Sequence, residues 1–329
     1  MPKITIITPI LNEEENLPSF RARLVETLRQ IDAECEIILA DDHSTDQSPQ
    51  IAKAWMREDP RVCYLRLSRT FGPHAAAAAA LTRSTGDCAV LLSSDLQDPP
   101  ELIPSLIEKW RSGYDVVWGA RAVPPRESWA KNIANDLFYS MLRRIAMPDL
   151  PQRGAEYMLL DRKVIDAYLA IREKHTNFVG MVLWMGYRQT SISYVRQDRQ
   201  AGRSKWNLSK KLKLLVDSIV SFSYAPIRLA SLLGVCLSLL GFLYALGLVF
   251  NKLWGSPEAG WSSTMAAVLV IGGCQLLMLG VIGEYIWRTF DEARGRPRYL
   301  IEEFVCRASE RQELDRVGPR DENSNERRG

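Results

Sequence analysis

Cysteine and histidine are scarce in this chain, and neither occurs in a spacing typical of metal ligands. No two cysteines form a C-x-x-C pair, and no two histidines lie close together. This pattern excludes the common zinc-binding motifs and gives no disulfide framework. Because three cysteines fall in predicted strands and two in very apolar segments, we expect buried, reduced thiols. The residues are Cys35, Cys63, Cys88, Cys236, Cys274 and Cys306, with His43, His74 and His175.

A strong excess of one charge is also missing. The 329 residues carry 42 lysines and arginines against 39 acidic residues, a formal net charge of +3. Such a balance gives no reason to expect nucleic acid as a partner. The N-terminus lacks the basic-then-apolar pattern of a signal peptide, and Met1 is followed directly by a strand-like segment, so we expect no leader to be removed.

The first 200 residues alternate between strand-like and helix-like segments. Apolar runs at 3–9, 35–42, 62–68, 87–94 and 115–118 predict strands, and 16–30, 48–58, 73–83 and 100–112 predict helices. The strands are continuously apolar rather than alternating, which is typical of a mostly parallel sheet covered on both faces. The sequence therefore predicts an α/β domain.

Two long segments without any charge follow, at 229–250 and 261–283. As helices, each would span roughly 30 Å, the thickness of the hydrocarbon core of a bilayer. A helical hairpin buried in a soluble core is the alternative, but neither segment is amphipathic. Basic residues flank the pair on its outer sides, whereas the loop between carries only Lys252, so we predict two membrane spans with both chain ends in the cytoplasm.

The segment 93–101, SSDLQDPPE, stands out because acids and amides directly follow the apolar strand at 87–94. The carboxyl ends of strands are where open α/β sheets bind ligands. Carboxylate and amide oxygens suit Mg²⁺ or Mn²⁺, which commonly bridge a protein to a pyrophosphate. The segment thus indicates a nucleotide-activated substrate. Taken alone, such a segment is more often a polar turn before a proline-started helix, and the rest of the chain favours the binding site.

Three further polar segments follow the other strands in the same way: PILNEE at 9–14, DDHSTD at 41–46 and SRTFG at 68–72. Each one alone is a common loop. Four of them at the same edge of one sheet indicate a binding site, in which the acids and hydroxyls of 41–46 could hold a ribose and a base.

With these motifs the chain resembles the family-2 glycosyltransferases of GT-A fold. More narrowly, it is similar to the bacterial polyprenyl-phosphate glycosyltransferases, which include undecaprenyl-phosphate glucosyltransferases, and to dolichol-phosphate mannose synthase. The resemblance covers nearly the whole chain. It rests on DLQDPPE at 95–101, GYRQT at 186–190 and GRSKW at 202–206, together with the two apolar segments.

The resemblance implies a role for each of several residues. Asp95 and Gln97 would bind Mg²⁺ or Mn²⁺, and Asp95 and Glu156 would be catalytic. The nucleotide-sugar would contact Pro9, Leu11, Glu13, Asp41, Asp42, Ser68 and Ser94. The acceptor or a phosphate would contact Arg121, Arg126, Arg196, Arg199, Arg203 and Lys205.

The resemblance also implies an activity and an organisation. The reaction would be inverting transfer of a sugar from a nucleotide-sugar, for which we expect a UDP-sugar, to undecaprenyl phosphate. A GT-A domain at 1–206 would precede an interfacial amphipathic helix at 207–226, two membrane helices at 227–287 and a cytoplasmic tail at 288–329 that is disordered at its end. The protein would be a multi-pass protein of the inner membrane with its catalytic domain in the cytoplasm, and a homo-oligomer, by resemblance a tetramer.

The chain departs from the family pattern in three places. Ser93 replaces the first acid of an Asp-Ala-Asp motif, His43 replaces a glycine, and Met158 stands where members often carry an arginine. Glu156 keeps a carboxylate at the place of the catalytic acid. Two other functions therefore stay open, a non-catalytic subunit that binds a sugar nucleotide or lipid, and a processive polysaccharide synthase, although the Gln-x-x-Arg-Trp motif of the latter is absent.

Overall fold

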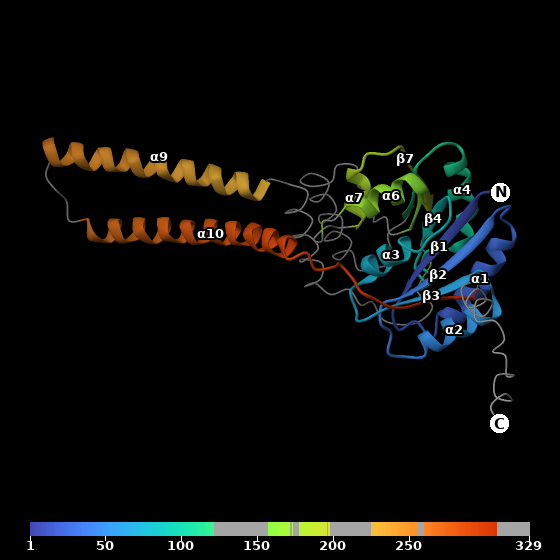
Figure 1. The fold of residues 1–329 in the computed structure, drawn as a ribbon. Helices are drawn as coiled ribbons and strands as arrows, with labels where there is room; N and C mark the ends of the chain where they lie inside the picture. Colours follow the sequence, from blue (N-terminus) through green and yellow to red (C-terminus); the bar gives the residue numbers. More distant parts are fainter. Residues whose placement is uncertain are drawn as a thin grey trace, which may run out of the picture.

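The computed structural model describes residues 1–121, 157–171, 173, 178–195, 197, 225–254 and 260–307. An eight-stranded sheet forms the centre of the N-terminal part, with helices on both of its faces (Figure 1). Its strand order is β7-β5-β6-β4-β1-β2-β3-β8. The strands are β1 (Lys3–Ile10), β2 (Glu34–Asp41), β3 (Val62–Leu67), β4 (Cys88–Leu91), β5 (Val116–Arg121), β6 (Met158–Asp161), β7 (Gln189–Tyr194) and β8 (Ile301–Cys306).

Four of the strand pairings are parallel. Strand β1 pairs with β2 and β4, β2 pairs with β3, and β5 pairs with β7. Strand β6 runs antiparallel to both β4 and β5, so β5 and β7 run in the same direction as β1. Strand β8 is antiparallel to β3. The predicted α/β fold with a mostly parallel sheet is confirmed, and the sheet is mixed because β6 and β8 run the other way.

The helices cover the sheet in two groups. Helices α1 (Leu17–Arg29), α2 (Ser48–Glu58) and α4 (Ile103–Arg111) pack on one face, where the core includes Ile6 and Ile37. Helices α3 (Pro73–Leu81), α6 (Arg162–Ala170) and α7 (Phe178–Trp184) pack on the other, against Ile7 and Ile38. Burial on both faces explains why the strands are continuously apolar.

Helix α3 is built almost entirely from alanine, and Ala76 to Ala80 are all buried. Small side chains let this helix lie close to the sheet, where it contacts β1 and β2. Gly72 precedes it with φ of 104°, a conformation that glycine adopts without steric cost, and Pro73 occupies the first turn, where a missing N–H is tolerated. The predicted helix at 73–83 is confirmed, two residues shorter at its end.

Two long helices, α9 (Ala225–Trp254) and α10 (Trp261–Ala293), form a hairpin that projects away from the sheet (Figure 1). They touch where Gly234 faces Met278, since a Cβ at Gly234 would lie 3.3 Å from the Met278 Cε. Many of their apolar side chains are exposed, among them Phe242 and Leu276. Within the described part of the chain, one stretch, Val270–Ala293, is long and apolar enough to cross a membrane, and none of its most apolar window is buried. Both helices form where expected, but two membrane spans stay a prediction.

Cys63 and Cys306 form a disulfide, so the expectation of reduced thiols is wrong for these two residues. They are directly opposite each other in the antiparallel β3–β8 pair, with Cα atoms 4.4 Å apart. Directly opposite residues of an antiparallel pair come within the range of a disulfide. Cys35 and Cys88 are free and buried as expected. Strand β8 itself was not predicted, because its residues fall in the segment interpreted as a tail.

Candidate active site

The polar segments identified in the sequence meet at one edge of the sheet. Strands β1, β2, β3 and β4 run parallel, so their carboxyl ends lie together, and the carboxyl ends of β5 and β7 lie at the same edge. The first residues of β8 also lie there, because this strand runs in the opposite direction beside β3. The edge therefore brings together residues from both ends of the chain.

After β4, the chain makes a tight turn around Leu96. Leu96 has φ of 58°, a left-handed conformation that is unusual for leucine, and its side chain is fully buried. Within the turn, Gln97 N donates to Asp95 Oδ1 at 3.2 Å and Asp95 N to Ser93 Oγ at 3.4 Å. Strained backbone of this kind clusters at functional sites. The buried leucine anchors the turn, and the turn holds Asp95 and Gln97 next to each other at the sheet edge.

The oxygen donors of this turn fit a hard divalent cation. Asp95 offers a carboxylate and Gln97 an amide carbonyl, both of them ligand types that Mg²⁺ and Mn²⁺ accept. Among the residues that the structure describes, no group of three or more histidine, cysteine or acidic side chains could enclose a metal. Mg²⁺ commonly uses one or two protein carboxylates and takes its other ligands from substrate phosphates and water. The donor set at Asp95 therefore fits a cation that binds together with a phosphorylated substrate.

Asp98 lies two residues after Leu96 and connects the 95–101 segment to strands β5 and β7. Its carboxylate is buried and accepts a hydrogen bond from the Tyr194 hydroxyl at the end of β7. The Arg121 Nε atom, at the end of β5, lies 3.9 Å from the same Asp98 oxygen. Burial raises the pKa of the Tyr194 hydroxyl, so this phenol keeps its proton and remains the donor. Arg121, predicted to contact the acceptor, thus lies beside the predicted metal-binding motif.

Further contacts attach the motif to helix α1 and to the residues after β7. Arg23 of α1 binds both carboxylate oxygens of Glu101, at 2.8 and 2.7 Å. The same guanidinium donates to Gln197 Oε1 at 2.9 Å, and Gln197 N donates to Gln97 O at 3.0 Å. The segment after β7 is therefore bound directly to the Asp95–Gln97 turn.

The loop after β2 is organised by Asp41, whose carboxylate is fully buried. One oxygen accepts from Ser44 N at 2.8 Å. The other accepts from the Tyr64 hydroxyl at 2.6 Å and from Arg66 Nη1 at 2.5 Å. Burial also raises the pKa of Tyr64, which stays protonated as a donor. Asp41 therefore holds its own loop and strand β3 together.

The carboxylate of Asp42 accepts hydrogen bonds from the loop after β3. Its two oxygens accept from the backbone N–H groups of Phe71 and Gly72, at 2.7 and 2.8 Å. Burial raises the pKa of this carboxyl. The next residue, His43, has φ of 67°, and its Nδ1 lies 3.1 Å from Leu67 O. Both acids predicted to contact a nucleoside thus also order the loops that form this side of the site.

The loop after β1 is bound to the loop after β2. Asn12 N donates to Ser44 Oγ at 3.0 Å, and Glu13 N donates to Ser48 Oγ at 2.8 Å. Asn12 has a left-handed φ of 51°. Pro9 and Leu11 are partly buried here, and Glu13 Oε2 accepts from Asn16 at 2.7 Å. The structure therefore brings Pro9, Leu11 and Glu13 together with the Asp41 loop.

Ser68 and Ser94 lie at the same edge in different surroundings. Ser94 is buried beside Asp95, whereas the Ser68 side chain is exposed. Ser68 N donates to Leu300 O at 3.0 Å, just before β8. Six predicted site residues lie outside the described residues: Glu156, Arg126, Arg196, Arg199, Arg203 and Lys205.

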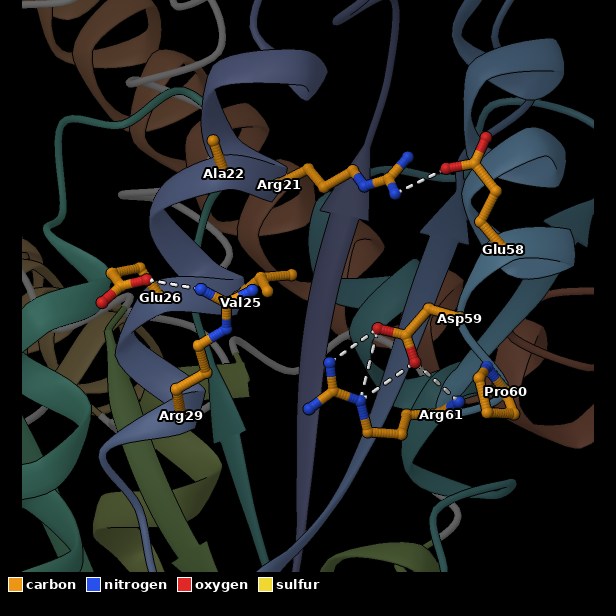
Figure 2. A pocket seen from close by; sticks show the side chains of 9 residues that line it. All are labelled: Arg21, Ala22, Val25, Glu26, Arg29, Glu58, Asp59, Pro60 and Arg61. Carbon is orange, nitrogen blue, oxygen red and sulfur yellow. Dashed lines mark hydrogen bonds and ion pairs between the residues drawn. The ribbon is translucent and has the colours of Figure 1, made fainter.

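A cavity of about 430 Å³ lies away from this edge, between α1 and the segment that leads into β3 (Figure 2). Its charged side chains are paired with one another. Arg21 contacts Glu58 at 2.6 Å, Arg29 contacts Glu26 at 3.0 Å and the Arg61 guanidinium binds the Asp59 carboxylate at 2.7 Å. The cavity is at the amino end of β3, whereas the four polar segments identified in the sequence lie at the carboxyl ends of their strands.

Three residues at the site were not found from the sequence: Arg66, Tyr194 and Glu302. Arg66 did leave a signal, because it is the only charged residue in an otherwise apolar strand, VCYLRL. Tyr194 and Glu302 left none, since their strands β7 and β8 were not predicted.

Comparisons with known proteins show which family the chain belongs to. Residues 5–169 match the model of glycosyl transferase family 2, and residues 225–288 match the model of the GtrB C-terminal hairpin. The chain belongs to glycosyltransferase family 2. It is a glycosyltransferase with a GT-A, Rossmann-like α/β domain, as the sequence motifs predicted.

Relatives resemble the chain over nearly its whole length. An uncharacterized glycosyltransferase, YkcC, of Bacillus subtilis is 40% identical over 91% of this chain and 93% of its own. A bactoprenol glucosyl transferase of Shigella phage SfX is 35% identical over 91% and 98%. An undecaprenyl-phosphate 4-deoxy-4-formamido-L-arabinose transferase of Proteus mirabilis is 32% identical over 92% and 94%. The similarity thus includes both the sheet and the hairpin.

Proposed function

We propose that this glycosyltransferase moves a sugar, with inversion, from a nucleotide-sugar to a polyprenyl phosphate. The observation that carries the proposal is the Asp95–Gln97 turn at the edge of a GT-A sheet, in a chain that also has the α9–α10 hairpin. A sugar-transfer site combined with a long apolar hairpin suits an acceptor that lies in a membrane. The names of the relatives from Shigella phage SfX and Proteus mirabilis support the same acceptor class.

The chemistry requires an anionic nucleophile and a stabilised leaving group. A lipid phosphate is already ionised at neutral pH, so a strong general base is not required. Mg²⁺ or Mn²⁺ held by Asp95 and Gln97 would neutralise the charge that develops on the departing nucleoside diphosphate. Glu156 keeps its predicted catalytic role in this proposal.

The two halves of the site would bind different parts of the substrates. The loops after β1 and β2, with Asp41 and Asp42, would receive the nucleoside, for which we propose uridine. Arg121 and the basic residues Arg126, Arg196, Arg199, Arg203 and Lys205 would bind phosphate of the lipid acceptor or of the donor. The relatives are named for different sugars, glucose and a formamido-arabinose, so the proposal leaves the sugar open.

The membrane arrangement is part of the proposal. Helices α9 and α10 would both span the inner membrane, with the residues at 207–226 at its surface. The sheet domain and both chain ends would then lie in the cytoplasm, where basic residues flank the hairpin. An oligomer of this chain, a tetramer, would place several sites on the same membrane.

A transfer assay tests the proposal. Membranes that contain the full-length chain are incubated with undecaprenyl phosphate and a panel of radiolabelled UDP- and GDP-sugars, with and without Mg²⁺ or Mn²⁺. We expect metal-dependent label in a lipid product from one donor. The Asp95→Ala variant should lose this transfer and still insert into membranes.

Asp87→Ala is the matched control. Asp87 lies at the other end of β4, where its carboxylate accepts from Lys3 N at 2.8 Å. This variant should retain transfer, because Asp87 is at the opposite edge of the sheet. Unchanged transfer in Asp95→Ala would reject the metal assignment. No transfer from any donor, despite nucleotide binding by the purified wild type, would favour a non-catalytic binding subunit instead.

A further inference from the structure

Strand β8 brings a residue from the far end of the chain to the donor side of the site. After the hairpin, the chain returns to the sheet and pairs with β3 (Figure 1). The ladder is irregular at its start: Arg66 pairs with Glu303, but Leu67 pairs with Ile301. This shift leaves Glu302 without a partner in the ladder, and such bulges redirect side chains beside active sites.

Glu302 faces two residues of the site. Its Oε2 atom accepts from Arg66 Nε at 3.1 Å and lies 3.7 Å from His43 Nδ1. Arg66 in turn binds Asp41 at 2.5 Å and donates to Ser44 O at 3.1 Å. A continuous chain of contacts thus runs from β8 through one guanidinium to the turn at residues 41–44.

The Arg66 guanidinium connects Glu302 to the turn at residues 41–44 and can restrict the conformation of that turn. Only 18% of its side chain is exposed, and its planar group contacts Asp41, Ser44 and Glu302 in fixed directions. Each contact removes some of the rotational freedom of the side chain. With Glu302 in place, Arg66 can hold the turn in one conformation before any nucleotide binds.

The segment that joins α10 to β8 is itself attached to the sheet domain. Arg298 donates to Ile171 O at 3.0 Å, at the end of α6. Leu300 O accepts from Ser68 N at 3.0 Å, directly after β3. Strand β8 therefore enters the sheet from a fixed position, which determines where Glu302 points.

We infer that Glu302 is a positioning residue for donor binding: it holds Arg66, and Arg66 holds the Asp41–Ser44 turn that receives the nucleoside. The inference rests on the proposed function, since it assigns the nucleoside to this turn. Glu302 itself does not touch the substrate. The nucleoside half of the site is complete only when the strand that follows the hairpin is in the sheet.

The test uses the purified full-length protein in detergent, with UDP as the binding probe and undecaprenyl phosphate as the acceptor. Glu302→Gln removes the charge that binds Arg66 and keeps the size of the side chain. Because the Glu302 side chain is half exposed, we expect the dissociation constant of UDP and the donor KM to rise about twofold to fivefold. The kcat, the acceptor KM and the unfolding temperature should stay as in the wild type.

Glu303→Gln is the matched control, with the same change of charge one residue along β8. Glu303 binds Lys53 of α2 at 2.7 Å. Its variant should keep the donor KM of the wild type. Glu302→Asp, which keeps the charge, should recover part of the donor affinity that Glu302→Gln loses.

Three outcomes would overturn the inference. Donor KM could be unchanged in Glu302→Gln, it could rise equally in both glutamine variants, or it could rise only together with a lower unfolding temperature. In each case the wild type is still active, and the proposed function stands. If the wild type neither binds UDP nor transfers sugar from a UDP donor, the proposed nucleoside site fails, and this inference fails with it.

Discussion

Replacing Asp41 with asparagine tests whether the buried carboxylate holds the nucleoside side of the site. The carboxylate accepts three hydrogen bonds, from Ser44 N, the Tyr64 hydroxyl and Arg66 Nη1. Asparagine keeps one acceptor oxygen, but its NH₂ group must face donors on the other side. The variant therefore loses at least one hydrogen bond and leaves Arg66 without its buried counter-charge.

The expected loss of stability follows from these contacts. A hydrogen bond to a charged group contributes about 1.5–3 kcal/mol, and breaking a buried ion pair costs about 3–5 kcal/mol. Arg66 keeps its contact to Glu302 and is 18% exposed, so we expect the lower end, about 3 kcal/mol. For a domain of this size, that corresponds to an unfolding temperature lower by about 6–12 °C.

The measurement is thermal unfolding of the purified full-length protein, followed by tryptophan fluorescence. Asp46→Asn is the control, because Asp46 also accepts from two backbone N–H groups, Ser48 N and Glu14 N, but is partly exposed. We expect this control to lose about 1 kcal/mol or less. Equal unfolding temperatures for the two variants would refute the reasoning, since burial and the Arg66 contact would then contribute nothing.

Two further predictions concern Tyr194 and Asp59. Tyr194→Phe removes the hydroxyl that donates to buried Asp98. We expect the free energy of unfolding, measured in denaturant, to fall by about 1.5–3 kcal/mol. The control Tyr114→Phe, at a partly exposed ring, should lose about 0.5 kcal/mol or less. Equal losses would argue against the Asp98 contact. The Arg61 guanidinium holds the pKa of Asp59 below its usual value, so the ionised carboxylate stabilises the fold above about pH 4, and this contribution is lost as the pH falls through the lowered pKa. The difference in unfolding temperature between wild type and Asp59→Asn should therefore shrink in acid; a difference independent of pH would contradict the ion pair.

Much of the sheet domain could be predicted because its signals are local. The strand at 62–68 and the helix at 48–58 agree with β3 and α2 within one residue at each end. A run of apolar residues or a spacing of three to four reports the local structure directly. The polar segment after β4 was equally visible, because it interrupts an apolar strand.

The roles of the acids at the edge were less visible. Asp41 and Asp42 were expected to contact a nucleoside. In the structure, Asp41 accepts from Ser44 N and the Tyr64 hydroxyl, and Asp42 accepts from backbone N–H groups of the loop after β3. Asp98 was part of the quoted motif, but its attachment to Tyr194 requires β7, which was not predicted. Hydrogen-bond partners that lie far apart in the chain leave no local pattern.

The sequence by itself determined the α/β class, the positions of the first strands along the chain, the polar turn after β4 and the positions of the two apolar helices. Each of these depends on residues that are close together in the sequence, so their spacing can be read from the chain directly. Only the tertiary structure decided that β8 returns to the sheet, that Cys63 meets Cys306 and that Glu302 reaches Arg66. These contacts join residues more than 230 positions apart, as the 236 between Arg66 and Glu302 illustrate. They form because an open edge of β3 has unpaired backbone groups that a returning strand can satisfy.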